Sequence, residues 1–423
     1  MNPSNKKVEY LQIAKNVHIF CMQTDQYKTS FEINLTSGGS YFEKENESGV
    51  SHLLEHCTVA RTKELDFDQL QHFLFEKNID RNASTSNLTL NFIMSGHRDE
   101  TDKMLEMIYE FAFAPTFEQS ILDQEKQIVL REIDQRSGDP DYRLRKFVME
   151  NVFEPGSLYL SDPLGKREDV INATLENLQT VYKRILSQSQ VVIGAVGKDI
   201  SIEKLKAELE KYLPNIESEN ALPIAYLPEN KLKEFKFKAL VNDLAHEHAI
   251  LDIIIPFQMK YDDEHVRLFL NDLIFEYPVG VLYDKLRNKL GLVYGLYYDF
   301  YISGNMLDIQ LICDVQNVNK IVEVIKDTLN NPEEVISVDK INIIRDLTMK
   351  KQQLMEDNKG RLFSFTLDEF MDWGENVSLE EFSNKIKTVT VDQIKEIYET
   401  LVKGMEKMRV LVVSNNKEIE ELG

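Results

Sequence analysis

The feature that most constrains the fold is a repeated order of strands and helices in the two halves of the chain. Apolar and β-branched runs between turn signals predict strands, and apolar residues at helical spacing predict helices. In the first half the predicted strands are residues 18–24, 28–38, 82–96 and 190–197, and the predicted helices are residues 66–78, 100–115, 118–153 and 173–186. The second half has strands at 248–257, 307–315 and 408–414, and helices at 264–275 and 318–329, with further long helical segments. This order predicts an α+β fold of two similar units in tandem, each an antiparallel-rich sheet covered by helices.

Residues 214–234 separate the two halves. This segment contains three prolines and shows no hydrophobic period, which is typical of a linker. A chain of 423 residues is also too long for one ordinary hydrophobic core. We therefore predict an N-terminal domain at 1–213, a linker at 214–234 and a C-terminal domain at 235–423.

The composition predicts a soluble protein of a reducing compartment. Hydrophobic residues make up 43% of the chain and charged residues 28%, and no apolar run is long enough to span a bilayer. The first ten residues, MNPSNKKVEY, lack the apolar core of a secretory signal, so we expect a cytoplasmic location. The three cysteines, Cys21, Cys57 and Cys313, are too few for a disulfide framework.

The net charge of −22 argues against nucleic-acid binding, because a phosphate backbone needs clustered Lys and Arg. Two interpretations of this charge remain open. It can serve solubility alone, or it can line a negative chamber that attracts basic polypeptides.

Residues 49–62, GVSHLLEHCTVART, contain two histidines and a glutamate in a predicted apolar helix. His52 and His56 are four residues apart and therefore project from the same helix face, with Glu55 at its border. Imidazoles are costly to bury unless their nitrogens have partners. A metal ion bound by His52 and His56 would satisfy this need.

A second carboxylate-bearing helix is predicted to complete such a site. A hydrolytic zinc usually has three protein ligands and one open position for water. Glu125 and Glu132 are seven residues apart, close to two helical turns, so both face the same side. Zinc lowers the pKa of water to about 7, and a nearby carboxylate such as Glu55 can accept the proton. The H-x-x-E-H pattern alone also fits two ordinary histidines of a surface or core helix.

The segments SGGSYFEKENESGVSHLLEH and EKQIVLREI resemble the pitrilysin or insulinase family of zinc metallopeptidases, which includes short two-domain bacterial members and the mitochondrial processing peptidases. DPLGKREDVINATLENLQTVYKRIL and VIGAVGKD are similar to later parts of the same domain. Glu132 follows His56 by 76 residues, which is about the family's spacing. The resemblance implies one Zn²⁺ per chain held by His52, His56 and Glu132, with Glu55 as the catalytic general base. It also implies that Glu125 supports the catalytic site from one helical repeat earlier.

Two further matches imply substrate contacts. RNASTSNLTLNF resembles the family's Asn-Ala-x-Thr edge strand, which places Asn82, Ala83 and Thr85 where a substrate backbone is added to the sheet. The alternative is an ordinary core strand rich in polar residues. LYDKLRNKLGLVYGL resembles the family's Arg-x6-Tyr segment, which implies that Arg287 and Tyr294 hold the substrate and stabilise charge on the scissile carbonyl.

The chain departs from the family after its motif. The family commonly continues with an aromatic residue and Lys-Gly-Thr, whereas this chain reads CTVART, which bears on substrate preference more than on metal binding. We expect Cys57 to be a buried structural thiol. His246 and His248 are two apart and could bind metal, but a solvated turn or strand entrance is favoured. The other histidines lack partners at ligand spacing and are expected to be surface or satisfied residues: His18, His72, His97 and His265.

The resemblance implies a zinc metalloendopeptidase that hydrolyses peptides or unfolded polypeptides bound as an extended strand. A noncatalytic partner subunit of the same fold and a maturation protease for the leader of one small peptide remain as alternatives. Closed chambers in the family contain four units, with the zinc motif in the first and the Arg-Tyr pair in the last. This chain has two units, half of such a clamshell, so we expect a homodimer or a heterodimer with a related subunit. Neither nucleic acid nor a membrane is an expected partner.

Overall fold

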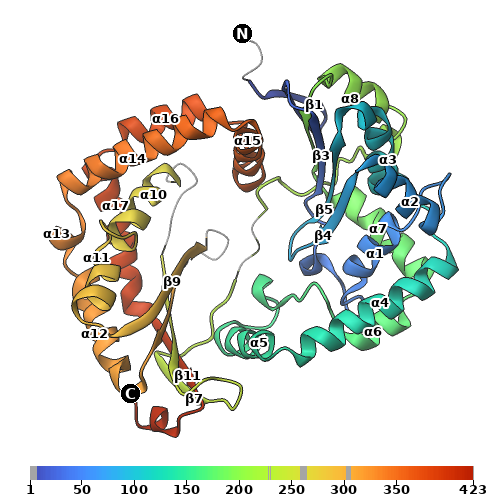
Figure 1. Cartoon of the computed structure of the whole chain (residues 1–423). Helices are drawn as coiled ribbons and strands as arrows, with labels where there is room; N and C mark the ends of the chain where they lie inside the picture. Colours follow the sequence, from blue (N-terminus) through green and yellow to red (C-terminus); the bar gives the residue numbers. More distant parts are fainter. Residues whose placement is uncertain (1–6, 227, 229, 258–263, 302–305, 423) are drawn as a thin grey trace. The chain divides into compact units, whose positions relative to one another are not determined.

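A computed structural model of the chain describes residues 7–226, 228, 230–257, 264–301 and 306–422. Six of the ten residues used above for the cytoplasmic expectation, residues 1–6, lie outside the described residues, as do linker positions 227 and 229. The chain forms two compact units, each with its own sheet and helices (Figure 1). Unit 1 consists of Met1–Gly138, Ser161–Tyr226 and Met355–Ser378, and unit 2 of Asp139–Leu160, Leu227–Leu354 and Leu379–Gly423.

The sheet of unit 1 has six strands in the spatial order β1-β2-β6-β3-β5-β4. All neighbouring pairs are antiparallel except β2 and β6. The strands are β1 Glu9–Ala14, β2 Val17–Gln23, β3 Lys28–Leu35, β4 Asp80–Thr85, β5 Leu90–His97 and β6 Val191–Gly197.

The sheet of unit 2 has five strands in the order β7-β11-β8-β10-β9, and only β7 and β11 are parallel. Its strands are β7 Phe237–Val241, β8 Ala249–Pro256, β9 Val293–Tyr301, β10 Met306–Cys313 and β11 Arg409–Ser414. When β1 is set aside, both sheets place their strands in the chain order first, fifth, second, fourth, third. The predicted duplication of an antiparallel-rich α+β unit is therefore confirmed by topology.

The helices also occur in corresponding places. Those that begin in the first half are α1 Val50–Val59, α2 Phe67–Lys77, α3 Thr101–Phe113, α4 Gln119–Gly138, α5 Pro140–Val152, α6 Arg167–Asn172, α7 Leu175–Gln188, α8 Ile202–Leu209 and α9 Leu213–Ile216. Those of the second half are α10 Glu264–Ile274, α11 Val281–Tyr283, α12 Val318–Leu329, α13 Pro332–Val335, α14 Val338–Asp357, α15 Lys359–Trp373, α16 Leu379–Thr388 and α17 Val391–Gly404. The helical stretch predicted at 118–153 is divided into two helices, because α4 ends at Gly138 and α5 begins at Pro140, with Asp139 between them as the N-cap.

One strand prediction was wrong. Residues 82–96 were expected to form a single strand, but β4 and β5 form a hairpin. The turn is closed by a hydrogen bond from Ser86 N to Thr89 O of 2.9 Å, and the Ser86 hydroxyl accepts from the amides of Leu88 and Thr89. Side chains of Ser and Asn satisfy turn backbones in this way, and the alternating pattern concealed that signal.

The two units exchange one helix each. Helix α5 follows α4 in sequence but packs in unit 2, where Leu144, Val148 and Val152 join a core cluster that includes Ile254 and Leu411. Reciprocally, α15 packs in unit 1, where Phe363 lies so close to Gly194 of β6 that a Cβ there would come within 3.0 Å of its ring. The predicted division at residues 214–234 did not include this exchange and stays a prediction about domain boundaries.

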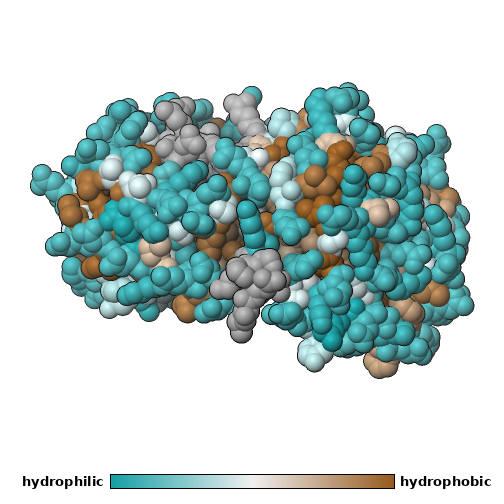
Figure 2. Space-filling model, turned by 90° about the horizontal axis from the view of Figure 1, so that it is seen from above, coloured by the Kyte–Doolittle hydropathy of each residue, from teal (hydrophilic) through white to brown (hydrophobic). Residues whose placement is uncertain are grey.

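The face of the molecule seen from above is predominantly polar. Hydrophilic residues cover most of the face shown in Figure 2, and hydrophobic residues appear between them in small groups. Across the described part of the chain, no helix combines the length and apolarity needed to cross a membrane.

Candidate metal centre

The helix α1 is fixed at its N-terminus by Gly49 and Glu43. Gly49 has a φ of 91°, and a Cβ at this position would lie 2.6 Å from the carbonyl oxygen of Leu164. The partly buried Glu43 carboxylate accepts hydrogen bonds from Gly49 N at 2.9 Å and Ser51 N at 2.7 Å. These bonds satisfy amides that an α-helix leaves without intrahelical partners. The start of α1 is therefore held in one conformation.

The apolar face of α1 is buried in the core of unit 1 through Val50, Leu53, Leu54 and Cys57. His52 and His56 lie on the remaining face, where they are partly buried, and their rings are 4.7 Å apart between centroids. Helix α4 packs against α1 and buries Leu122 and Val129. The core therefore fixes both helices that carry the predicted metal ligands.

His52, His56 and Glu132 form a cluster that could hold a metal ion, named the metal-binding cluster from here on. Glu132 Oε2 lies 3.0 Å from His52 Nε2 and 3.6 Å from His56 Nε2, and the three donor atoms lie within 4.8 Å of one another. Two ligand atoms about 2.1 Å from a tetrahedral ion would be about 3.4 Å apart. The spacing of these donors therefore suits a tetrahedral metal ion. No other group of three His, Cys, Asp or Glu residues in the described ranges has its donor atoms this close together.

Two further carboxylates orient the imidazoles. Glu125 Oε2 lies 3.1 Å from His56 Nδ1, and Glu55 Oε2 lies 3.3 Å from His52 Nδ1. These contacts direct both Nδ1 atoms to carboxylates and leave both Nε2 atoms directed at Glu132, as in other carboxylate–histidine–metal arrangements. Glu125 is 4% exposed and contacts a ligand rather than the metal position, which fits a supporting role.

Glu55 has a second partner on the neighbouring sheet. The hydroxyl of Thr85 donates to Glu55 Oε2 at 2.6 Å. Burial raises the pKa of Glu55, but the bonds from His52 and Thr85 outweigh it, and the net pKa is lowered. Burial lowers the pKa of His52, but Glu55 and Glu132 outweigh it, and the net pKa is raised. The cluster is thus a tightly coupled group of two imidazoles and several carboxylates.

Strand β4, which carries the predicted substrate residues, lies at the edge of the sheet of unit 1. Asn82 is exposed, whereas Ala83 packs against the core and Thr85 points to Glu55. One side of β4 pairs with β5, so its other side presents the backbone groups of an edge strand. This is the geometry that strand addition requires.

Arg287 and Tyr294 both belong to unit 2 and lie next to each other. The guanidinium of Arg287 donates to the carbonyl oxygen of Val293 at 2.6 Å, one residue before Tyr294. Tyr294 is 53% exposed, its hydroxyl donates to Asp314 at 3.1 Å, and its ring lies 4.6 Å from that of His248. The sequence pair therefore forms one local feature of unit 2, and its role with substrate stays a prediction.

Other sequence predictions concern residues outside the cluster. Cys57 is a free, buried thiol, as expected, and burial raises its pKa to about 12. His18 is buried and satisfied by Tyr10 at 3.0 Å and Gln190 at 2.9 Å. His248 is bonded to Asp314 at 3.1 Å and belongs to no metal cluster among the described residues.

Two supporting residues were not found from the sequence. Glu43 lies six residues before the helix start it caps, too far for the local capping patterns. Arg81 of β4 donates to the carbonyl of Val59 at the end of α1, stacks 5.9 Å from the Phe111 ring, and interacts electrostatically with Glu125. For Arg81, the only local signal in the sequence was its position directly before the Asn-Ala-x-Thr pattern.

Comparisons with known proteins identify the family. The description "Insulinase (Peptidase family M16)" matches residues 21–162, and "Peptidase M16 inactive domain" matches residues 172–342. A protein of Helicobacter pylori named zinc protease PqqE is 24% identical over 254 residues, which are 59% of this chain and 57% of that protein. An uncharacterized zinc protease of Rickettsia felis is 23% identical over 386 residues, 87% of this chain and 89% of its own length.

Solved structures show the same fold. A protease from Helicobacter pylori superposes with a TM-score of 0.75 at 16% identity, over 97% of this chain and 100% of that one. A structure from Pseudomonas fluorescens, described as a peptidase M16 inactive domain, gives a TM-score of 0.77 at 15% identity, over 97% and 98%. The two family matches together span most of the chain, and the metal-binding cluster lies inside the first. The chain belongs to the insulinase family of peptidases.

Proposed function

We propose that the chain is a zinc-dependent endopeptidase that hydrolyses peptides or unfolded polypeptides bound as an extended strand. The observation that carries this proposal is the convergence of His52, His56 and Glu132 from two helices, with Glu55 beside them. Three ligands and an adjacent carboxylate are what a hydrolytic metal site requires.

His52, His56 and Glu132 would hold the zinc ion, while Glu125 fixes the ring of His56. The bound ion supplies a Lewis acid and a water of lowered pKa. The three residues fit this ion because both imidazoles present Nε2 to one carboxylate oxygen at spacings of 3.0 and 3.6 Å.

Glu55 would act as the general base. Its carboxylate is held by the Thr85 hydroxyl and the His52 ring. Glu55 directly precedes the proposed ligand His56 in the sequence. It would accept the proton of the attacking water and later give it to the leaving amine. Because α1 is capped by Glu43 and buried on its apolar face, the base needs little reorganisation.

The substrate would pair with the free edge of β4 along Asn82 and Ala83, where the main-chain groups of alternate residues face away from β5. Because such pairing uses the main chain of the substrate, it depends little on the substrate's side chains, and peptides of many sequences would bind. Arg287 and Tyr294 would hold the substrate and donate to the developing oxyanion.

The alternative of a noncatalytic partner subunit is less well supported. The match described as inactive covers residues 172–342, whereas His52, His56 and Glu132 lie at residues 21–162. The sequence of α10 in unit 2, EHVRLFLNDLI, has no comparable motif. Loss of the motif in one unit is therefore compatible with activity in the other.

The experiment is hydrolysis of an unbiased peptide library by the purified chain. We expect cleavage that is abolished by a chelator, restored by added zinc and lost in Glu55→Gln. Glu64→Gln, an exposed carboxylate after α1, is the matched control and should cleave like the wild type. Cleavage that survives both the chelator and Glu55→Gln, or no cleavage of any peptide by the zinc-loaded protein, would contradict the proposal.

A further inference from the structure

The sheet of unit 2 carries an acidic group that the proposed mechanism does not use. Asp252 of β8, Asp308 of β10 and Asp299 of β9 lie on one face of the sheet. Asp308 is directly opposite Asp299, and Asp252 is opposite Gln310, the next residue on the same face. Helix α5 covers this face, and its apolar residues pack on Ile254 and Met306. Three carboxyl groups therefore lie within a surface that is otherwise packed as core.

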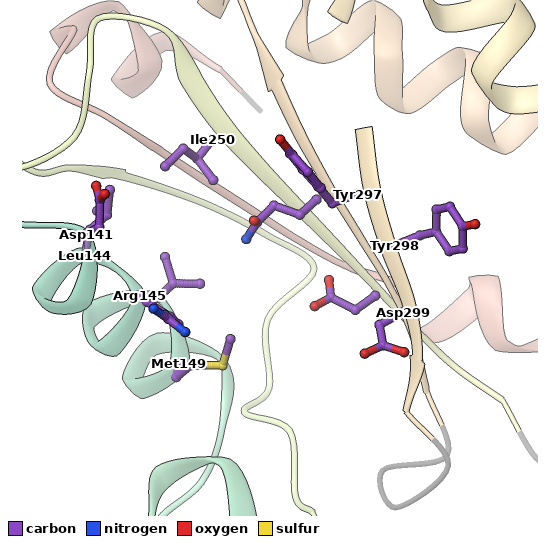
Figure 3. A pocket seen from close by; sticks show the side chains of 11 residues that line it. Asp141, Leu144, Arg145, Met149, Ile250, Tyr297, Tyr298 and Asp299 are labelled. Carbon is purple, nitrogen blue, oxygen red and sulfur yellow. The ribbon is translucent and has the colours of Figure 1, made fainter. Parts of the chain in front are cut away.

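A pocket of about 460 Å³ lies between α5 and these strands (Figure 3). Asp141, Arg145 and Met149 line it from the helix, and Tyr297 and Asp299 line it from β9. Asp308 and Gln310 line it from β10, and Leu144, Val148 and Ile250 add apolar wall. The pocket thus combines a carboxyl-rich side with a hydrocarbon side.

The side chain of Asp308, which lines the pocket, and that of Asp252 hydrogen-bond to each other, but one oxygen of each lacks a partner. Asp252 is 2% exposed, and the Oδ1 atoms of Asp252 and Asp308 are buried with no hydrogen-bond partner among the described residues. Burial raises the pKa of Asp252, and burial together with Asp252 raises that of Asp308. Buried polar atoms are rarely left unpaired, so an unpartnered oxygen that lines a pocket indicates a missing donor.

The charged residues of the lining indicate what kind of hydrogen-bond donor the pocket would bind. Asp141 and Asp299 are exposed, Asp308 is partly buried, and Arg145 is the single cation of the lining. Arg145 is four residues after Asp141 on α5 and offsets one negative charge. The lining therefore keeps a negative excess after Arg145 is counted.

We propose that this pocket binds the side chain of a lysine or arginine of a polypeptide substrate, with the cationic head at Asp308 and Asp299. The hydrocarbon stem of such a side chain would lie on Leu144, Val148 and Ile250. A bare metal ion fits less well for two reasons. It would gain no favourable contact from the apolar wall, and no three carboxylates of this pocket converge to metal-binding distance among the described residues. That the ligand is part of a substrate rests on the proposed peptidase function.

The test measures binding without turnover in a Glu55→Gln background. Short fluorescent peptides would carry one lysine, or one norleucine of the same stem length, at each position in turn. We expect one position at which lysine binds more tightly than norleucine, and we expect Asp308→Asn to remove that preference. A charge-assisted hydrogen bond of ordinary strength gives a change of about tenfold or more in Kd.

Asp299→Asn is the second variant, because it changes an exposed side chain and leaves the core intact. Asp346→Asn, on the exposed surface of α14 in the same unit, makes the same charge change away from the pocket and should keep the full preference. Equal binding of the lysine and norleucine peptides, or an undiminished preference in both pocket variants, would overturn the proposal.

The failure of this site and the failure of the proposed function are distinguishable. If wild-type protein cleaves peptides but the Glu55→Gln protein binds the lysine and norleucine peptides equally, or both pocket variants keep the full lysine preference, the peptidase proposal stands and the pocket proposal falls. If the lysine preference depends on Asp308 but the wild type cleaves nothing, the cation site stands without the peptidase.

Discussion

The Thr85 hydroxyl donates a hydrogen bond of 2.6 Å to the Glu55 carboxylate and so joins strand β4 to helix α1. Under the proposed function, the strand that takes up the substrate also holds the general base. The same Glu55 oxygen contacts His52 Nδ1 at 3.3 Å, so the bond also fixes a ring that would bind zinc. Thr85 is thus a positioning residue that couples the substrate strand to the base.

Replacing Thr85 by valine keeps the shape of the side chain and removes the donor. We expect Thr85→Val to lower kcat by about tenfold, the effect of one lost hydrogen bond to a charged group, with KM and zinc content nearly unchanged. Thr85→Ser retains the hydroxyl and should recover most of kcat. Steady-state kinetics on one peptide from the library would check this. A serine variant as impaired as the valine variant, or an effect on KM alone, would show that Thr85 acts through packing or substrate binding.

The metal ligands give a second prediction. His52→Ala and Glu132→Gln each remove one of three ligands and should leave the purified protein with little zinc. Glu125→Gln changes only the partner of His56 Nδ1, so zinc affinity should fall by about 10–100-fold and remain measurable. Elemental analysis and competition with a metal indicator would distinguish the two classes. Wild-type zinc in both ligand variants would show that the assignment is wrong.

Much of the metal centre follows from residue spacing. His52, Glu55 and His56 lie within five residues of one helix, and Glu125 and Glu132 are two turns apart on another. Helical periodicity alone therefore places each group on one face. The repeated strand order likewise predicted the duplicated sheet, because local hydrophobic pattern determines which residues face the core.

What the sequence did not predict depends on contacts between distant segments. The exchange of α5 and α15 is decided by which sheet their apolar faces cover, and both patterns would suit either sheet. Asp252 and Asp308 lie in apolar strands far apart in sequence, and only the pairing of β8 with β10 brings them together. Glu43 caps α1 across an intervening turn.

Glu43 leads to a prediction about stability and pH. Burial raises its pKa to about 7, although the amides of Gly49 and Ser51 lower it. Between about pH 4.5 and about pH 7 the folded protein therefore binds more protons at Glu43 than the unfolded chain does. This group's contribution to the free energy of unfolding thus falls as pH rises through that window.

Glu43→Gln should remove this contribution. In chelator-treated protein, we expect the urea midpoint of the wild type to fall more steeply from about pH 5 to about pH 7.5 than that of the variant. Glu45→Gln, an exposed neighbour, is the matched control and should follow the wild-type slope. Other buried carboxyls, such as Asp252 and Asp308, are present in all three proteins and cancel in the comparison. Parallel curves for wild type and Glu43→Gln would exclude this assignment.

The last prediction concerns assembly. The chain has two family-type units, with the metal-binding cluster in unit 1 and the pair Arg287 and Tyr294 in unit 2. We propose a homodimer of twofold symmetry in which this pair of one subunit completes the zinc site of the other.

Mixing two inactive variants, Glu55→Gln and Arg287→Ala, under conditions of subunit exchange should then restore activity. A mixed dimer has one site with both lesions and one site with neither. Random pairing makes about half of the dimers mixed, so activity should reach about a quarter of the wild-type value.

The control mixture combines Glu55→Gln with His52→Ala. Both lesions lie in the cluster of unit 1, so each site of a mixed dimer keeps one lesion and no activity should return. Exchange itself can be followed with differently tagged subunits, and the dimer by its mass in solution. If the tags mix and the Glu55→Gln and Arg287→Ala pair stays inactive, Arg287 does not complete the site of a second copy. Recovery in that pair and not in the control would instead require a composite site, because only then do the two lesions fall on opposite sides of one subunit boundary.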